Sequence, residues 1–419
     1  METSFSTSFA FDDTLNEEAK ICVIGVGGGG GNAVDNMIEK GIGGVDFWVV
    51  NTDLQSLAAN LAPSKIQAGI MLTKGLGAGA IPSVGAEAIE ESRTDIENAL
   101  QGFDMVFITA GMGGGTGTGG VPIVAQIAKD LGILSVAIVT KPFECEGKRR
   151  MAVSENGIDR LKEEIDTLII IPNERLLDIS EATTTLVEAF VKADEVLYNA
   201  TRGISDLITV HGLINLDFAD VRTTMTNGGT ALMGASTASG ENRAERAATE
   251  ALSSPLLDGV SIHGAKNVLV NITAGRSLGI REATAATGII QKEAGDDVEV
   301  IFGTVIDESM AGDLRITVIA TGFDMHKKLD GAARRKSLPL HADIPIAGYK
   351  GEENLKQLDV PAYRRRQATV SIAPVEGVED DTVETQRGVR RLNSEEIQTP
   401  ERILKGDTDV PAFLRKMMD

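Results

Sequence analysis

The sequence is poor in cysteine, the residue that cross-links small secreted proteins and holds structural zinc. Only Cys22 and Cys145 occur among its 419 residues, and they form no Cys-x-x-Cys pair. Disulfide scaffolds and structural zinc sites both need several cysteines at short spacings, so both are excluded and we predict no metal-ligating residues. A chain of this length has room for two domains with sizeable cores, plus tails.

Positive charge is also scarce. The chain carries 40 Lys and Arg against 61 Asp and Glu, a formal net charge of -21. Broad binding to nucleic acid or to an anionic membrane needs a clustered positive surface. We therefore expect no nucleic-acid partner and no direct membrane contact, although backbone amides of an acidic protein can still bind a phosphate.

Long apolar runs are missing as well. No stretch reaches the roughly 18 apolar residues of a membrane span, and residues 1–18 are polar, rich in Ser and Thr, and lack the basic start of a signal peptide. We expect a cytoplasmic protein whose first 18 residues form a disordered tail.

Glycine, in contrast, is plentiful and clustered. Residues 113–120 read GGGTGTGG, between a predicted buried strand at 104–110 and a predicted helix at 121–132. Each glycine costs chain entropy, so such a cluster indicates a backbone that turns sharply and approaches a ligand. A strand, a glycine loop and a helix start together present free N–H groups and a positive dipole end to an anion.

Two further glycine clusters extend this pattern. The run GVGGGGG follows a predicted strand at 20–25 and precedes a helix, and GLGAGA at 75–80 precedes a predicted helix at 85–102. Strands that alternate with helices predict a parallel sheet with ligands at the carboxyl ends of its strands. We therefore expect the three glycine loops to share one pocket.

A second part of the chain follows a long predicted helix at 185–207. Its apolar residues recur three and four apart and predict one buried stripe; they are Leu186, Val187, Phe190, Val191, Val196, Leu197, Ile204 and Leu207. The β-rich runs beyond it predict a smaller α+β domain. The predicted segments are a tail at 1–18, a nucleotide-binding domain at 19–182, a connecting helix at 183–209, the α+β domain at 210–323, a flexible linker at 324–401 and an amphipathic docking peptide at 402–419.

The glycine patterns leave two nucleotide classes open. Gly25-x-Gly27-x-x-Gly30 after a strand, with Asp53 closing the next strand, fits a dinucleotide fingerprint and thus an NAD-dependent oxidoreductase. A second phosphate loop at 113–120 instead favours a nucleoside triphosphate, although no Gly-Lys-Ser/Thr follows any glycine cluster.

Seven motifs occur in an order and spacing that resemble the FtsZ family, the bacterial tubulin-like cell-division GTPases. They are GVGGGGGNAV, NTD, GLGAGA, TAGMGGGTGTG, PFECEGKRRM, IPNERLL and NLDFADVRT. The resemblance covers residues 20–323 and resumes at DVPAFLRK near the C-terminus. It implies a tubulin-like α/β fold, in which a Rossmann-like parallel-sheet domain is joined by a long central helix to a smaller α+β domain.

The resemblance also implies the residues that bind GTP and GDP. Two glycine loops grip the phosphates, two charged residues contact the ribose and phosphate region, and Asn173, Phe190 and Asp194 contact the sugar or base. Phe190 can stack on a base while Asp194, one helical turn later, can accept from a guanine N1–H and amino group. The implied set is Gly28, Gly29, Gly30, Gly31, Asn32, Gly115, Thr116, Gly117, Glu146, Arg150, Asn173, Phe190 and Asp194.

No glycine loop supplies a general base for hydrolysis. Asp217 and Asp220 are three apart at a predicted helix start, where their carboxylates can share one face and orient a water. The alternative is that Asp217 only caps the helix. The resemblance implies that Asn215, Asp217 and Asp220 act on the nucleotide of a neighbouring subunit, with Mg²⁺ bridging the phosphates.

The resemblance further implies a cellular role. We expect a head-to-tail homopolymer at the mid-cell division ring, whose hydrolysis is coupled to filament turnover. Its C-terminal peptide would bind membrane tethers and regulators similar to FtsA, ZipA or MinC, so that it reaches the membrane only indirectly. A tubulin-like filament that positions plasmid or phage DNA is the alternative with similar chemistry.

Overall fold

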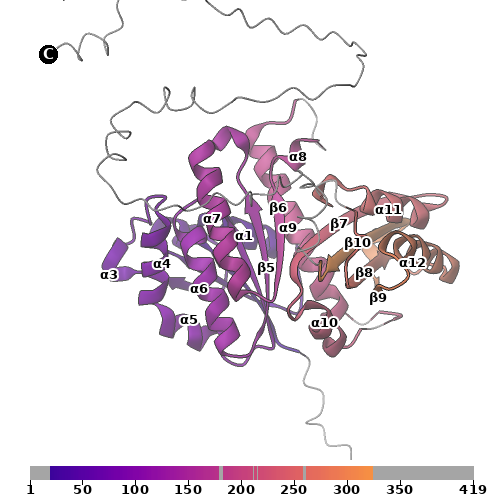
Figure 1. Ribbon diagram of the computed structural model, residues 1–419, viewed down its shortest axis with the longest axis horizontal. Helices are drawn as coiled ribbons and strands as arrows, with labels where there is room; N and C mark the ends of the chain where they lie inside the picture. The colour runs from indigo at the N-terminus through magenta and orange to yellow at the C-terminus, as the bar shows by residue number, and fades with distance from the viewer. Residues whose placement is uncertain (1–18, 179–182, 211, 215, 258–260, 324–419) are drawn as a thin grey trace, which may run out of the picture. The chain divides into compact units, whose positions relative to one another are not determined.

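The fold alternates strands and helices before a long helix and continues as a second, sheet-rich part (Figure 1). The computed structural model describes residues 19–178, 183–210, 212–214, 216–257 and 261–323. The first part contains β1 (Ile21–Val26), α1 (Gly27–Glu39), β2 (Asp46–Asn51), α2 (Leu54–Ala59), β3 (Ser64–Gln67), α3 (Ile70–Thr73), α4 (Pro82–Glu91), α5 (Arg93–Leu100), β4 (Met105–Gly111), α6 (Thr116–Asp130), β5 (Leu134–Lys141), α7 (Lys148–Glu164), β6 (Thr167–Pro172) and α8 (Arg175–Asp178). The long helix is α9 (Leu186–Thr209), and it is followed by α10 (Phe218–Met225), β7 (Gly229–Ser239), α11 (Arg243–Leu252), β8 (Asn267–Ala274), α12 (Ile280–Ala294), β9 (Glu299–Ile306) and β10 (Asp313–Thr321).

The ten strands of the described residues form one hydrogen-bonded sheet in the order β3-β2-β1-β4-β5-β6-β7-β10-β8-β9. Strands β1 to β6 are all parallel, as the alternation of strands and helices predicts. A short parallel pairing of β6 with β7 at residues 167–169 connects them to the second part, where β10 runs antiparallel to both β7 and β8. The parallel α/β fold and the smaller α+β part are thus both confirmed, within one continuous sheet.

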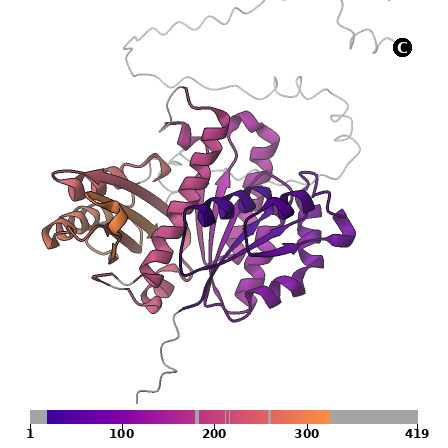
Figure 2. The same cartoon turned by 180° about the vertical axis from the view of Figure 1, so that it is seen from behind.

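Three hydrophobic clusters follow from the alternation of side chains along the strands. On one face of the parallel strands, Phe107 and Val136 pack against α1 and α9; on the other, Ile108 and Val139 pack against α5, α6 and α7. In the second part, α11 and α12 cover one face of the sheet and α9 covers the other. Figure 2 shows α9 from behind, running between the two parts of the fold.

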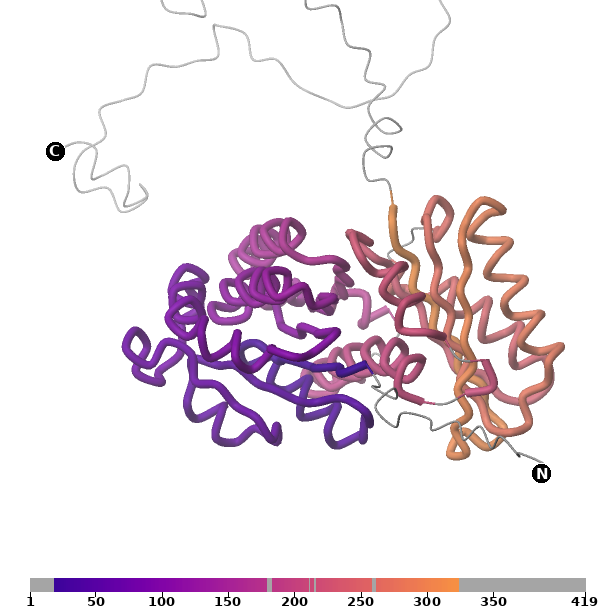
Figure 3. Tube along the Cα trace, turned by 90° about the horizontal axis from the view of Figure 1, so that it is seen from below, coloured from indigo at the N-terminus to yellow at the C-terminus, as the bar shows by residue number. Residues whose placement is uncertain are grey.

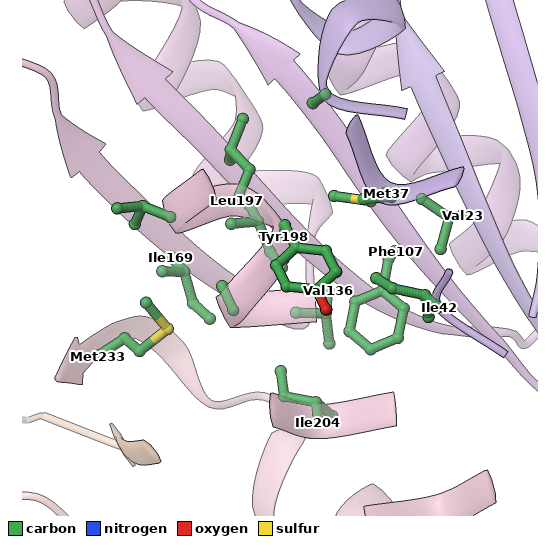
Figure 4. Packing of buried hydrophobic residues seen from close by; sticks show 14 of the residues in the cluster. Val23, Met37, Ile42, Phe107, Val136, Ile169, Leu197, Tyr198, Ile204 and Met233 are labelled. Carbon is green, nitrogen blue, oxygen red and sulfur yellow. The ribbon is translucent and has the colours of Figure 1, made fainter. Parts of the chain in front are cut away.

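Helix α9 therefore belongs to both cores. Figure 4 shows Leu197, Tyr198 and Ile204 of this helix among buried residues from β4, β5 and β7. The predicted stripe is correct only for the later turns of the helix, because Leu186, Val187, Phe190 and Val191 are exposed. On the first two turns, these four side chains are not part of the hydrophobic clusters.

The later turns of α9 are held to the second part by polar contacts. Arg202 donates to Asp206 Oδ2 at 2.9 Å, to the Tyr198 hydroxyl at 2.8 Å and to Asp307 Oδ2 at 2.8 Å. Asn271 on β8 also donates to the Gly203 carbonyl at 2.9 Å. Because Asp307 follows β9, these bonds fix the end of the helix to the second part of the fold.

The structure corrects three predicted element boundaries. The glycines after β1 are not a loop, because α1 already begins at Gly27. Likewise α6 begins at Thr116, so only residues 113–115 of the second cluster lie in a loop. The single helix predicted at 85–102 is two helices, which meet at Ser92.

Several predicted segments lie outside the described residues. They are the tail at 1–18, the linker at 324–401, the docking peptide at 402–419 and Asn215. Within the described ranges, every helix is too short or too polar to cross a membrane. Figure 3 shows the described chain as a tube, with the first part at one end and the strands and helices that follow α9 at the other.

Candidate nucleotide site

A cavity of about 370 Å³ lies at the carboxyl ends of β1, β4, β5 and β6. This is the edge of a parallel sheet at which α/β proteins bind ligands. Eleven of the thirteen predicted nucleotide-binding residues line it: Gly28, Gly29, Asn32, Gly115, Thr116, Gly117, Glu146, Arg150, Asn173, Phe190 and Asp194. The structure thus brings together residues from five separate segments of the chain.

The N-termini of α1 and α6 meet at this cavity. A side chain at Gly27, whose φ is +74°, would lie 2.9 Å from the backbone nitrogen of Gly117, so the two helix starts touch only because both residues are glycine. Neither helix has a side-chain cap or an acidic residue in its first turn. Their first N–H groups are therefore available to an anion, and both dipoles favour one.

The remaining predicted glycines pack rather than line the cavity. A Cβ on Gly30 would collide with the Thr109 carbonyl and lie 2.9 Å from the carbonyl carbon of Gly25. Gly31 contacts Asn60, whose side chain donates to the Gly31 carbonyl at 2.9 Å. These two glycines let α1 pack closely against its neighbours and do not line the cavity, so their role in nucleotide binding stays a prediction.

The third glycine cluster, residues 75–80, packs against a loop that lines the cavity. Residues 75–80 do not line the cavity, which corrects the prediction of three loops around one pocket. Instead, a Cβ on Gly115 would lie 2.8 Å from the Cβ of Ala78 and 2.9 Å from the nitrogen of Ile81. The GLGAGA segment thus rests directly on the loop before α6.

Asn173, Phe190 and Asp194 come together at the side of the cavity formed by β6 and α9. Asn173 is 4% exposed, and its Oδ1 has no hydrogen-bond partner within the described chain. Buried acceptors are normally paired, so a bound ligand could supply the hydrogen-bond donor that this oxygen lacks. Burial, and secondarily the charge of Asp35, raise the pKa of Asp194 to about 6.

Glu146 and Arg150 form an ion pair at the rim of the cavity. Glu146 also accepts from the backbone N–H of Phe143 at 2.9 Å through its other oxygen. Among the described residues that line the cavity, Arg150 carries the only positive charge. An anion would therefore be held mainly by backbone N–H groups of the two helices.

Asp217 and Asp220 lie away from this cavity, at the start of α10. Asp217 is the residue before the helix, yet its side chain makes no capping hydrogen bond, so the capping alternative is not supported. Neither aspartate contributes to the cavity of its own chain.

Sequence reasoning missed several lining residues, including Met112, Thr140 and Pro142. Thr140 and Pro142 could have been predicted, because they stand at the end of a predicted strand that is parallel to β4.

Asp53 does not have the role that the dinucleotide fingerprint gives it. Its carboxylate caps α2 by accepting from Gln55 and Ser56 at 2.9 and 3.3 Å, and it does not line the cavity.

Comparisons with known proteins agree with this arrangement. Residues 20–181 match the family model described as Tubulin/FtsZ family, GTPase domain, and residues 229–324 match FtsZ family, C-terminal domain. Similar solved structures include an empty FtsZ dimer from M. jannaschii, at 45% identity and TM-score 0.70 over 73% of this chain and 88% of that one. The GTPgS-bound protofilament of CetZ2 from Haloferax volcanii shares the fold at 22% identity and TM-score 0.62, over 74% and 95% of the two chains.

Proposed function

Since the chain belongs to the FtsZ family of tubulin-like GTPases, we propose that it binds GTP in this cavity and hydrolyses it only after assembling head to tail. The helix N-termini of α1 and α6 hold the phosphates. Asn173, Phe190 and Asp194 hold the nucleoside, with the Asp194 carboxylate accepting from guanine N1–H and the amino group.

The observation that carries this proposal is that backbone N–H groups of two helix starts face the cavity, while neither of its two acidic side chains is placed for catalysis. Its acidic side chains are Glu146 and Asp194. Glu146 is paired with Arg150 and with a backbone N–H, while Asp194 lies on α9 beside Phe190. A water-orienting group must therefore come from elsewhere, and Asp217 and Asp220 are carboxylates that their own cavity does not use.

Exposed apolar side chains mark two surfaces that a second copy could cover. Met71 lies just before the segment 75–80 that supports Gly115, and Leu76 lies within it; they are 79% and 86% exposed. Leu213 and Ile214 are exposed just before Asp217. Exposed apolar groups of this kind are typical of protein interfaces, and contact between these two surfaces would carry the aspartates of one subunit to the cavity of the next.

Magnesium would enter this site with the nucleotide. The described residues contain no group of three or more His, Cys, Asp or Glu side chains placed to hold a metal ion. Phosphate oxygens would therefore supply most of its ligands, and the ion would neutralise charge on the phosphates during hydrolysis.

Light scattering and phosphate release, followed together after addition of GTP, test this function. We expect the rate per subunit to rise with protein concentration, as scattering does, because each active site needs two chains. GDP should support neither signal. A rate per subunit that is independent of concentration would contradict the shared site.

We further propose that the polymer forms the cytoplasmic division ring at mid-cell and binds membrane tethers or regulators through residues 402–419. The spacing of apolar residues in DVPAFLRKMMD predicts an amphipathic docking peptide at the end of a long polar segment. Deletion of 402–419 should leave GTP hydrolysis unchanged and abolish recruitment of the polymer to vesicles that carry a tether protein. Unchanged recruitment would refute this docking role.

A further inference from the structure

We propose that Phe143 is a positioning residue for base recognition, because its buried ring fixes the ring of Phe190 at the edge of the cavity. This inference rests on the proposed guanine nucleotide site. It adds a residue that does not line the cavity and that the sequence motifs did not single out for binding.

The contact between the two rings has a defined geometry. Their centroids are 5.3 Å apart and their planes meet at 87°, an edge-to-face arrangement. Phe143 is 2% exposed, whereas Phe190 is 40% exposed. One ring is thus anchored in the protein, and the other lies between that anchor and solvent.

The anchoring residue lies just beyond a central strand of the sheet. Phe143 follows β5, which pairs with β4 on one side and β6 on the other. Phe190 is on the second turn of α9, in the part of the helix whose neighbours Leu186, Val187 and Val191 are all exposed. Helix packing therefore does little to hold the Phe190 ring, and Phe143 supplies the contact that does.

Phe143 also contacts a second part of the site through its backbone. Its N–H donates to Glu146 Oε1 at 2.9 Å, and the other Glu146 oxygen pairs with Arg150. One residue therefore connects the ring beside Asp194 with the ion pair at the rim. A side-chain substitution at 143 removes the ring contact and leaves the N–H in place, so the two roles can be separated.

Order in the Phe190 ring matters for binding because stacking on a base fixes a side chain that otherwise samples several rotamers. A ring that is already held loses less entropy when the ligand arrives. Removing the Phe143 ring should therefore weaken guanine nucleotide binding through Phe190, while the phosphate-binding helix N-termini stay intact.

A double-mutant cycle on the full-length protein tests this inference, with GDP affinity measured by titration. Phe143→Leu should weaken GDP binding about 2- to 10-fold, the range of an edge-to-face ring contact. In a Phe190→Leu background the same substitution should change affinity less than about 2-fold, since the contact is already lost. Phe107→Leu, a matched loss of a buried ring from the sheet, should leave affinity within about 2-fold.

The outcomes separate this inference from the proposed function. If the unmodified protein binds no GDP or GTP, the proposed function itself fails. If it binds, but Phe143→Leu costs the same with and without the Phe190 ring, or no more than Phe107→Leu, then Phe143 is only structural and the inference is wrong. Should Phe143→Leu not fold, Phe143→Met keeps more of the side-chain volume without the ring and completes the same cycle.

Discussion

The hydroxyl oxygens of Thr52 and Thr116 lie 2.6 Å apart, within one buried hydrogen bond. Thr52 follows β2 and is fully buried, while Thr116 begins α6 and lines the cavity. Each hydroxyl has one hydrogen to donate. If Thr52 donates to Thr116, the Thr116 hydrogen is free to bond to a phosphate oxygen. Thr52 can therefore determine whether Thr116 acts as a donor to the nucleotide.

Thr52→Val should therefore weaken GTP binding about 3- to 10-fold, because valine removes the donor and puts a methyl group against the Thr116 oxygen. Thr52→Ser keeps the hydroxyl and should bind within about 2-fold of the unmodified protein. Titration with GTP gives both values. Equal affinities for the valine and serine variants would show that the hydroxyl does not matter.

Guanine binding should weaken as the pH falls through about 6. Burial raises the pKa of Asp194 to about 6 from an ordinary value of 3.8, and only the ionised carboxylate accepts both guanine donors. GDP affinity measured between pH 5 and 8 should follow this ionisation in the unmodified protein. Asp194→Asn should bind at least about 10-fold more weakly at pH 7.5, with a flatter pH dependence.

The same group affects the stability of the nucleotide-free protein in the opposite direction. Its pKa is higher in the folded chain than in the unfolded chain, so its ionisation opposes folding. This cost is absent below the unfolded value of 3.8, grows up to about pH 6 and is complete above it. Asp194→Asn should therefore raise the Tm of the nucleotide-free protein at pH 7.5. An unchanged or lower Tm would argue against a destabilising buried carboxylate at this position.

Asp220→Ala should bind GTP normally but release phosphate about 100-fold more slowly or worse, because it lacks a carboxylate that orients water. A second variant, Phe190→Ala with Asp194→Ala, should lose GTP binding. Mixed together, the two inactive proteins should release more phosphate than the sum of each alone, since GTP in the first would meet Asp220 of the second. If light scattering shows that the mixed proteins assemble but they still release no extra phosphate, catalysis takes place within one chain.

Two glycine substitutions should separate packing from binding. A Cβ on Gly119 would collide with the Pro82 carbonyl and lie 2.7 Å from the backbone nitrogen of Ala86. Gly119→Ala should therefore destabilise the fold by about 2 to 4 kcal/mol through the α4–α6 contact. Gly28 has nothing within 4 Å of that position, so Gly28→Ala should keep the Tm and lower nucleotide affinity. Denaturant unfolding and GDP titration distinguish the two effects.

The parallel sheet was predictable because each buried strand is short, apolar and followed by a helical pattern. The cavity was predictable for a related reason, since its residues follow strands whose carboxyl ends share one edge. Sequence could not show where the glycine-rich helices begin. Glycine disfavours helices in isolation, but both helices contain glycines at positions such as Gly30 and Gly119, where neighbouring backbone lies too close for any side chain.

Contacts between distant segments were beyond the sequence patterns as well. Gly30 and Gly28 look alike in a run of five, yet one packs against Thr109 and the other faces open space. Phe143 and Phe190 are 47 positions apart by number, and no period connects them. The pairing of β6 with β7 also depends on how α10 folds back, through bonds such as that from the Thr167 hydroxyl to the Met225 carbonyl.

Helix α9 has contacts at both ends that fix its length. Near its start, Phe190 and Asp194 face the cavity, and eight residues beyond Asp194 the Arg202 side chain bonds to Asp206, Tyr198 and Asp307. Each helical residue turns the following ones by about 100° and moves them about 1.5 Å. One residue inserted between Asp194 and Arg202 would therefore rotate every later side chain of α9 away from its partners at β8 and β9. The number of residues between the cavity and these polar contacts is therefore fixed by the helix, and an insertion or deletion within α9 would disrupt one set of contacts or the other.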